Sequence, residues 1–206
     1  DDGRKALKFE TARIDELSGT VDFGETALRW GEVKGILKPG QGRGSYEASL
    51  SRGQLLTPLS LFPRLDLKEM VLRYIDDELI LKNGSWKVFS SGRMATEGEI
   101  DFGSGDYFFE GILDDVQCDE VVPENWARRI TGELTSTFTV EGEIGETPLI
   151  EGDLRLSGGY LTALPVLDRI ASYTAIERFR RLSLRRAELK FRQEGKRLEL
   201  TDIVVV

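Results

Sequence analysis

Residues 133–144, ELTSTFTVEGEI, carry the clearest pattern in the chain. Their side chains alternate between two kinds. One set is apolar and consists of Leu134, Phe138, Val140 and Ile144, while the other set is mostly threonine and glutamate. A period of two is typical of a strand with one buried and one solvated face, as antiparallel sheets commonly have. The stretch therefore predicts an antiparallel sheet that is dry on one face.

Turn signals divide the rest of the chain into pieces of strand length. Asn83-Gly84 is the strongest hairpin signal, because both central residues of a type I′ turn need positive φ. Gly24-Glu25, Ser104-Gly105 and Glu194-Gly195 predict three more hairpins. The apolar pairs that these four turns predict are Leu81 with Trp86, Leu79 with Val88, Phe102 with Tyr107, Ile100 with Phe109, Val21 with Leu28, Phe191 with Leu198 and Leu189 with Leu200.

These signals predict an all-β fold, a long and curved antiparallel meander of roughly 11 to 13 strands whose dry face forms a trough. No Pro- or Ser-rich linker interrupts the sequence, so residues 1–206 are expected to form a single β-rich domain. Residues 58–78 fit neither period well. Pro58 and Pro63 disfavour a helical residue before them, so this stretch is predicted to be extended.

One amphipathic helix is predicted, within residues 163–180. It follows a strand in which Leu154 and Leu156 alternate with polar residues, and Gly158 and Gly159 separate the two. Pro165 fits the first turn of a helix. The apolar residues of the helix are spaced three and four apart, and they are Leu164, Leu167, Ile170 and Ala171. We expect this helix to cap the trough.

Composition limits the function. The 36 acidic and 28 basic residues give a net charge of −8, which opposes binding to nucleic acid. The chain has no histidine, the commonest general base and metal ligand, and its single Cys118 has no partner for an intrachain disulfide. No apolar run is long enough to span a bilayer. We expect no metal, no cofactor and no enzymatic activity.

Several motifs suggest chemistry, but each has a simpler explanation. Asp-Phe-Gly occurs at 22–24 and 101–103, yet a kinase also needs a histidine-containing catalytic loop. GQGRG at 40–44 precedes a strand instead of a helix, so a hairpin loop is favoured over a phosphate site. The acidic residues Asp76, Asp77, Glu78, Asp114, Asp115, Asp119 and Glu120 are interpreted as solvated strand ends. A basic patch at Arg178, Arg180, Arg181, Arg185 and Arg186 suits either lipid head groups or a helix C-terminus.

The second half of the chain resembles the C-terminal region of the AsmA-like family, which includes TamB-like envelope proteins. The resemblance lies in VVPENWARRITGELTSTFTVEG at 121–142 and in residues 151–206, with the order strand, glycine, short Leu-Pro helix, Phe-Arg and two strands. It extends over roughly 65–206. It implies a bacterial envelope protein of the periplasm, anchored in the inner membrane, whose apolar trough carries phospholipids between membranes or supports outer-membrane biogenesis. The chain departs from the family in being short and in lacking the N-terminal membrane anchor.

The predicted function is therefore to bind or conduct phospholipid or another acyl lipid along the trough. The residues expected to line it are Phe102, Leu134, Phe138, Val140, Leu154, Leu156, Leu189 and Phe191. The alternative is a structural β domain that binds protein partners through its sheet edges. The chain starts without methionine and ends on an apolar strand at 203–206. We therefore expect a piece of a longer protein, with the membrane anchor outside it and one edge of the last strand exposed.

Overall fold

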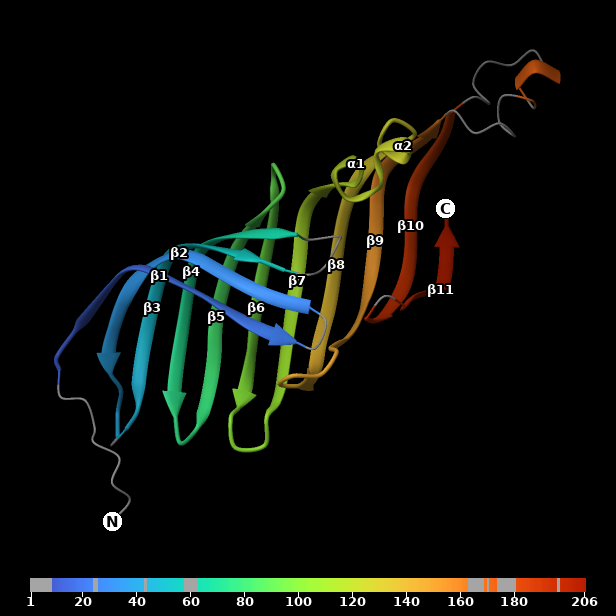
Figure 1. The fold of residues 1–206 in the computed structure, drawn as a ribbon. Helices are drawn as coiled ribbons and strands as arrows, with labels where there is room; N and C mark the ends of the chain where they lie inside the picture. Colours follow the sequence, from blue (N-terminus) through green and yellow to red (C-terminus); the bar gives the residue numbers. More distant parts are fainter. Residues whose placement is uncertain are drawn as a thin grey trace.

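The computed structural model describes residues 9–23, 26–42, 44–57, 63–162, 169, 171–173, 181–195 and 197–206. Within them, eleven strands form one sheet (Figure 1). The strands are β1 (Ala12–Phe23), β2 (Thr26–Pro39), β3 (Tyr46–Leu56), β4 (Arg64–Ile75), β5 (Glu78–Val88), β6 (Gly92–Asp101), β7 (Asp106–Gln117), β8 (Ile130–Glu143), β9 (Leu149–Thr162), β10 (Arg181–Glu194) and β11 (Arg197–Val205).

The strands follow one another across the sheet in sequence order, and each neighbouring pair is antiparallel. β1 and β11 form the two edges, so the sheet is open. The predicted all-β antiparallel meander is confirmed. The extended conformation predicted for 58–78 is also confirmed in its described part, because Arg64–Ile75 is a strand.

The hairpin predicted at Asn83-Gly84 is wrong. β5 runs through both residues, and the turn between β4 and β5 lies at Asp76 and Asp77, with φ of 50° and 65°. Aspartate tolerates this left-handed conformation better than most residues. Gly84 is needed for another reason, since a Cβ there would lie 3.0 Å from Trp86 Nε1 and would overlap the Thr96 hydroxyl to which that nitrogen donates.

Two other predicted registers are wrong by a small shift. Ile100 lies opposite Tyr107, because Asp101 holds a wider turn in which its carboxylate accepts from Gly103 N at 2.7 Å. Phe191 lies opposite Leu200, since Glu194 pairs with Arg197 and moves that turn by one residue. The predicted pairing of Val21 with Leu28 between β1 and β2 is confirmed.

The sheet curves strongly along its strands (Figure 1). β-Bulges accompany the curvature, because an extra residue in one strand bends it and increases its twist. Register shifts occur in several pairs, including β1–β2, β2–β3, β4–β5, β7–β8, β8–β9 and β10–β11. Residues with positive φ lie at four of these irregular positions, and they are Glu32, Asp115, Gly132 and Asp202. Asp115, predicted as a solvated strand end, thus lies in a bulge, where its carboxylate pairs with Arg93.

Two short helices connect β7 to β8, and the sequence pattern did not predict them. They are α1 (Cys118–Val121) and α2 (Glu124–Ala127). Cys118 is buried in the core cluster beside Val116, so α1 closes one end of the apolar packing. Most of the helix predicted at 163–180 lies outside the described residues, including Leu164, Leu167 and Ile170. Ala171 is helical and buried, and the capping role stays a prediction.

Candidate functional site

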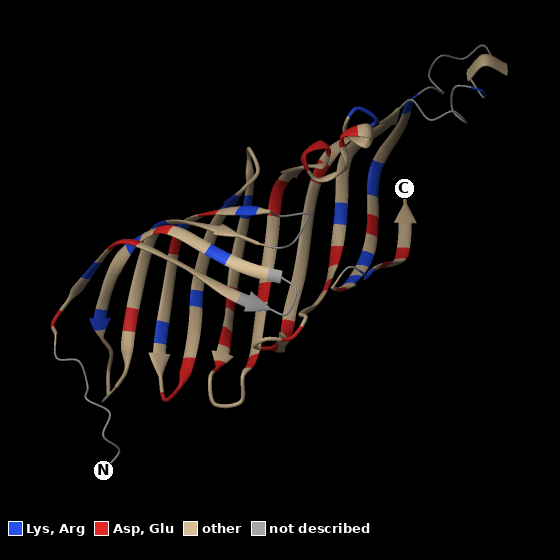
Figure 2. Cartoon of the chain, in the orientation of Figure 1, with Lys and Arg blue, Asp and Glu red and all other residues tan. Residues whose placement is uncertain are grey.

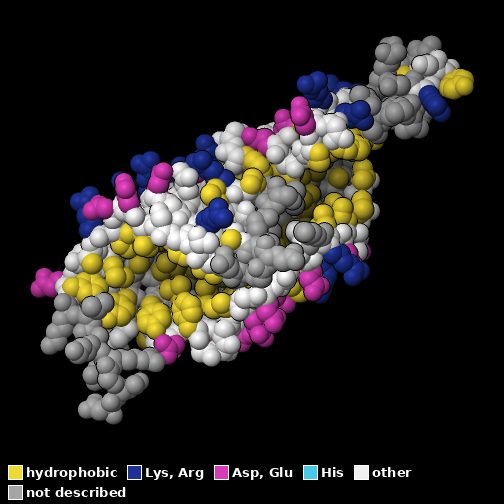
Figure 3. All heavy atoms as spheres, in the orientation of Figure 1, with side chains coloured by type: hydrophobic (Ala, Val, Ile, Leu, Met, Phe, Trp, Pro, Cys, Tyr) yellow, Lys and Arg dark blue, Asp and Glu magenta, His cyan; other side chains and the backbone are white. Residues whose placement is uncertain are grey.

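The sheet has two chemically different faces. We call the side that carries Leu134 and Leu156 the apolar face. Along β8 the buried or half-buried residues Leu134, Phe138 and Val140 alternate with exposed or half-buried polar ones, as the pleat of a strand requires. Figure 3 shows hydrophobic side chains gathered in the hollow of the curved sheet, with charged side chains along its rims. The apolar face is therefore the lining of a trough.

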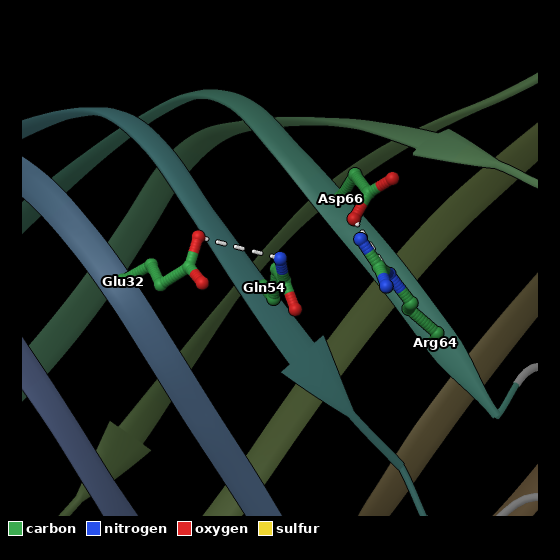
Figure 4. Close-up of polar contacts among 4 residues, drawn as sticks. All are labelled: Glu32, Gln54, Arg64 and Asp66. Atoms are coloured by element: carbon green, nitrogen blue, oxygen red, sulfur yellow. Dashed lines mark hydrogen bonds and ion pairs between the residues drawn. The ribbon is translucent and has the colours of Figure 1, made fainter.

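The opposite face is mostly polar, although Ile36, Phe108 and Ile112 are exposed on it. Figure 4 shows this at the N-terminal side, where Gln54 of β3 donates to Glu32 of β2 at 3.4 Å and Arg64 pairs with Asp66 of β4 at 2.9 Å. Asp66 alternates with the buried residues Leu65 and Leu67, so its side chain lies away from the apolar face.

All of the predicted trough residues except Phe102 come together on the apolar face. The register places Leu134 opposite Leu156 and Leu154 opposite Leu189. Phe138 and Phe191 lie on either side of Gly152, which pairs with both of them. The remaining member, Val140, pairs with Ile150. The pattern of β8 to β10 thus gives one continuous apolar surface across three strands.

Phe102 lies apart from this group. It follows β6 in the turn to β7, and half of its surface is exposed. Its ring centroid is 6.4 Å from that of Tyr74, which lies 6.5 Å from Tyr46, which lies 6.0 Å from Phe9. These four rings form a line across the turn ends of β3, β4 and β6, which we call the aromatic rim. Sequence reasoning did not connect them, because the line depends on the register of three hairpins.

Glycines let aromatic rings lie flat on the apolar face. A Cβ at Gly111 would overlap the Phe138 ring, and a Cβ at Gly152 would lie 2.8 Å from Phe191 Cε1. In each case the glycine is the cross-strand partner of the aromatic residue. Further pairs of this kind are Gly19 with Trp30, Gly98 with Phe109 and Gly142 with Tyr107. Rings that lie along the floor leave the hollow above them open. Glycines inside otherwise regular strands were the sequence signal for this arrangement.

Packing on the apolar face differs along the strands. At the end near α1, the core residues Val116, Leu134 and Leu156 are each at most 5% exposed. Toward the opposite ends of the same strands, Phe138 and Val140 are only half-buried, as are Phe191 and Leu189 on β10. The trough is consequently packed near α1, and toward the hairpin tips of β8 to β10 its packing is uneven, because these four residues are half-buried while Ile150 is 7% exposed.

A second hollow, of about 990 Å³, is lined mostly by side chains of the polar face. Its residues include Thr137 and Asp153, which alternate with residues of the apolar face. Two of its cations are paired with carboxylates, for Lys190 lies 3.2 Å from Asp202 and Arg192 bonds to Glu151. Its charged residues and threonines suit water better than acyl chains.

The structure gives a simpler explanation for Cys118, Glu120 and the GQGRG loop, which could suggest catalysis or ligand binding. Burial, with a smaller effect of Asp119, raises the pKa of Cys118 to about 11, so its thiol is protonated and inert at neutral pH. Glu120 accepts a hydrogen bond from Ser90 N at 3.1 Å. Gly42 and Gly44 lie in the hairpin loop between β2 and β3, where GQGRG was predicted to form a loop. Among the described residues, no group of His, Cys, Asp and Glu could hold a metal ion.

Comparison of the chain with protein-family models, curated proteins and solved structures gives no match. The AsmA-like resemblance therefore rests on the sequence pattern alone. Within the described part of the chain, we find no helix with the length and apolar character needed to cross a membrane.

Proposed function

We propose that the apolar face binds the acyl chains of lipids. The observation that carries this proposal is an open apolar surface, half-buried instead of packed, that continues across neighbouring strands through Phe138, Leu154, Leu189 and Phe191. In an ordinary core, a second layer would cover such a surface. No second sheet covers it in the described residues.

The size of the apolar face suits this ligand. Eleven strands about 4.8 Å apart extend over roughly 50 Å, more than the length of one acyl chain. A two-tailed phospholipid has about 30 methylene groups, and at about 0.8 kcal/mol each their exposure to water would cost more than about 20 kcal/mol. A carrier must therefore offer a continuous dry surface, which aromatic rings lying flat on glycines help to supply.

The AsmA-like resemblance supports a setting for this activity. We propose that the chain is part of a membrane-anchored bacterial envelope protein and that its trough conducts phospholipids across the periplasm. The lipid itself is then the partner, and the reaction is transfer without covalent chemistry.

Lipid extraction tests the proposal. Purified protein is extracted with organic solvent, and the extract is analysed by mass spectrometry. We expect co-purified phospholipid from the wild type and none from Phe138→Glu, because the charge lies on the half-buried floor. Thr137→Glu is the matched control, because Thr137 is next to Phe138 in β8 but its side chain lies on the polar face.

Thermal unfolding completes this test. In a trough the Phe138→Glu carboxylate can reach water at the open side, so its melting temperature should stay within a few degrees of the wild type. In a closed core the same unpaired charge would cost several kcal/mol and unfold the domain. Wild-type protein without lipid, together with an unfolded Phe138→Glu variant, would contradict lipid binding.

One observation favours the second candidate, a structural domain that binds partners by its edge. In the described residues, β11 pairs only with β10, and its last residues are apolar and exposed, with Ile203 at 62%. An unprotected edge of this kind can accept a further strand from a partner. Val204→Lys should abolish such pairing, measured by size-exclusion chromatography with light scattering, and should leave lipid content unchanged.

A further inference from the structure

Charge is unevenly distributed between the two ends of the strands. The turns of hairpins β4–β5, β6–β7 and β8–β9 are acidic, and their carboxylates are Asp76, Asp77, Asp101, Asp106, Glu143 and Glu146. At the other end, basic residues are concentrated where α2 leads into β8 and where β10 begins (Figure 2). The sheet is therefore polarised along its strands.

The residues of this second end are held together by the backbone. Arg129 N donates to Trp126 O at 2.7 Å, and Thr162 N at the end of β9 donates to Arg129 O at 2.7 Å. Thr162 also pairs with Arg181, the first residue of β10. The Arg181 guanidinium carbon lies 3.3 Å from the centroid of the Tyr160 ring. The strands β9 and β10 and the segment from α2 to the start of β8 thus contribute to one surface.

This surface combines exposed apolar groups with arginines. We call it the basic end and define it as Trp126, Arg128, Arg129, Tyr160, Arg181, Leu182 and Arg185. Trp126, Tyr160 and Leu182 are 40%, 37% and 45% exposed. In the described part of the chain, no carboxylate forms an ion pair with any of its arginines.

The nearest acidic side chains belong to the two short helices. Asp119 and Glu120 lie on α1, which packs against β8, α2 and β7, and Glu120 already bonds to Ser90 N. Glu124 opens α2. Among the described residues, four arginines against these three carboxylates leave the basic end with a positive balance.

We propose that the basic end docks on the surface of an anionic lipid bilayer. Arginine binds phosphate oxygens well, and Trp and Tyr favour the boundary between head groups and acyl chains. The net charge of −8 opposes contact through the remainder of the molecule, so the acidic turns would face away from the bilayer. Docking does not require the trough to hold lipid, and the two proposals therefore fail separately.

Vesicle flotation tests the docking. The protein is mixed with vesicles of phosphatidylcholine, or of phosphatidylcholine with phosphatidylglycerol, at low and high salt. We expect binding only to the anionic vesicles, and we expect salt to weaken it. The double variant R128E/R181E should lower binding by more than about tenfold. The control R13E/R64E changes the net charge equally on β1 and β4, at two exposed arginines, and should bind like the wild type.

Tryptophan fluorescence is a second test of docking, and it requires no variant with altered charge. Brominated phosphatidylglycerol should quench Trp126 in the wild type, and Trp126→Phe should remove the quenched signal, because Trp86 is buried and Trp30 lies on Gly19. Equal binding to neutral vesicles, equal loss in R13E/R64E, or no quenching of Trp126 would overturn the proposal. Binding to RNA without binding to vesicles would also overturn it. None of these results would change the lipid extracted from the trough.

Discussion

At the scale of single residues, glycine decides where the aromatic rings of the apolar face lie. Each of several glycines is the cross-strand partner of an aromatic residue, and the ring occupies the space that a Cβ would take. Glycine normally weakens a strand, and an aromatic neighbour that covers it restores part of the loss. These pairs therefore provide both sheet stability and a low floor in the trough.

Gly111→Ala is the direct test of this arrangement. The added Cβ would overlap the Phe138 ring and push it into the hollow, so we expect a loss of about 1–3 kcal/mol in the free energy of unfolding, measured by urea denaturation. Gly31→Ala is the control, because the nearest atom to its Cβ, Ser18 Oγ, is 3.6 Å away. Phe138→Leu should suppress much of the loss at Gly111. Equal effects of the two alanine variants would disprove the pairing.

A pair of glutamates on the polar face should make stability depend on pH. Glu97 and Glu110 are cross-strand partners, and the hydrogen bond to Glu97, with burial and repulsion as smaller causes, raises the pKa of Glu110. Since the folded-state pKa lies above the ordinary value, this carboxyl favours folding at acidic pH. The contribution is lost as the pH rises through the raised pKa.

Glu110→Gln should therefore raise the melting temperature at neutral pH, and the gain should vanish below the ordinary pKa of glutamate. Scanning calorimetry over a pH series measures this. Glu141→Gln serves as the control, because its cross-strand partners are Phe108 and Leu149 instead of another acid. A gain at Glu110 that does not change with pH would refute the explanation by proton linkage.

At the scale of elements, the β4–β5 hairpin shows how a turn signal can mislead. Asp76→Val should cost about 1–2 kcal/mol, because a β-branched residue fits a positive φ poorly. Asn83→Val should be neutral or stabilising, since Asn83 lies in a strand. Chemical denaturation of both variants checks the expectation. A larger loss of stability for Asn83→Val than for Asp76→Val would instead place the turn at Asn83-Gly84.

The alternation of apolar and polar residues was sufficient to predict the fold class and the shared face of Leu134, Phe138, Leu154 and Phe191. It was not sufficient to predict the register between neighbouring strands, because bulges and turn widths shift the pairing by one residue or more. The turn at Asp101 depends on a hydrogen bond from Gly103 N to the Asp101 carboxylate, which the spacing of apolar residues does not indicate. The basic end was also beyond a linear pattern, since the backbone of Thr162 links Arg129, next to α2, to Arg181 of β10.

At the scale of the whole molecule, stability should decline toward the edges of the sheet. Among the described strands, each pairs only with those next to it in sequence, so β1 and β11 have one neighbour there. We expect their amides to exchange with deuterium fastest and those of β5 to β8 slowest, as measured by mass spectrometry on the intact chain. Uniform exchange across all strands would indicate one cooperative unit instead of graded stability.

Because each described strand pairs only with its neighbours in sequence, the width of the sheet follows directly from the number of hairpins. Inserting one hairpin anywhere in the meander would disturb only the two strands that flank it, as in repeat proteins whose units contact only adjacent units. Each added hairpin would lengthen the apolar face by about 10 Å, the spacing of two strands. The length of the apolar face is thus set by the number of hairpins, and it can change through duplication without a redesign of the interior.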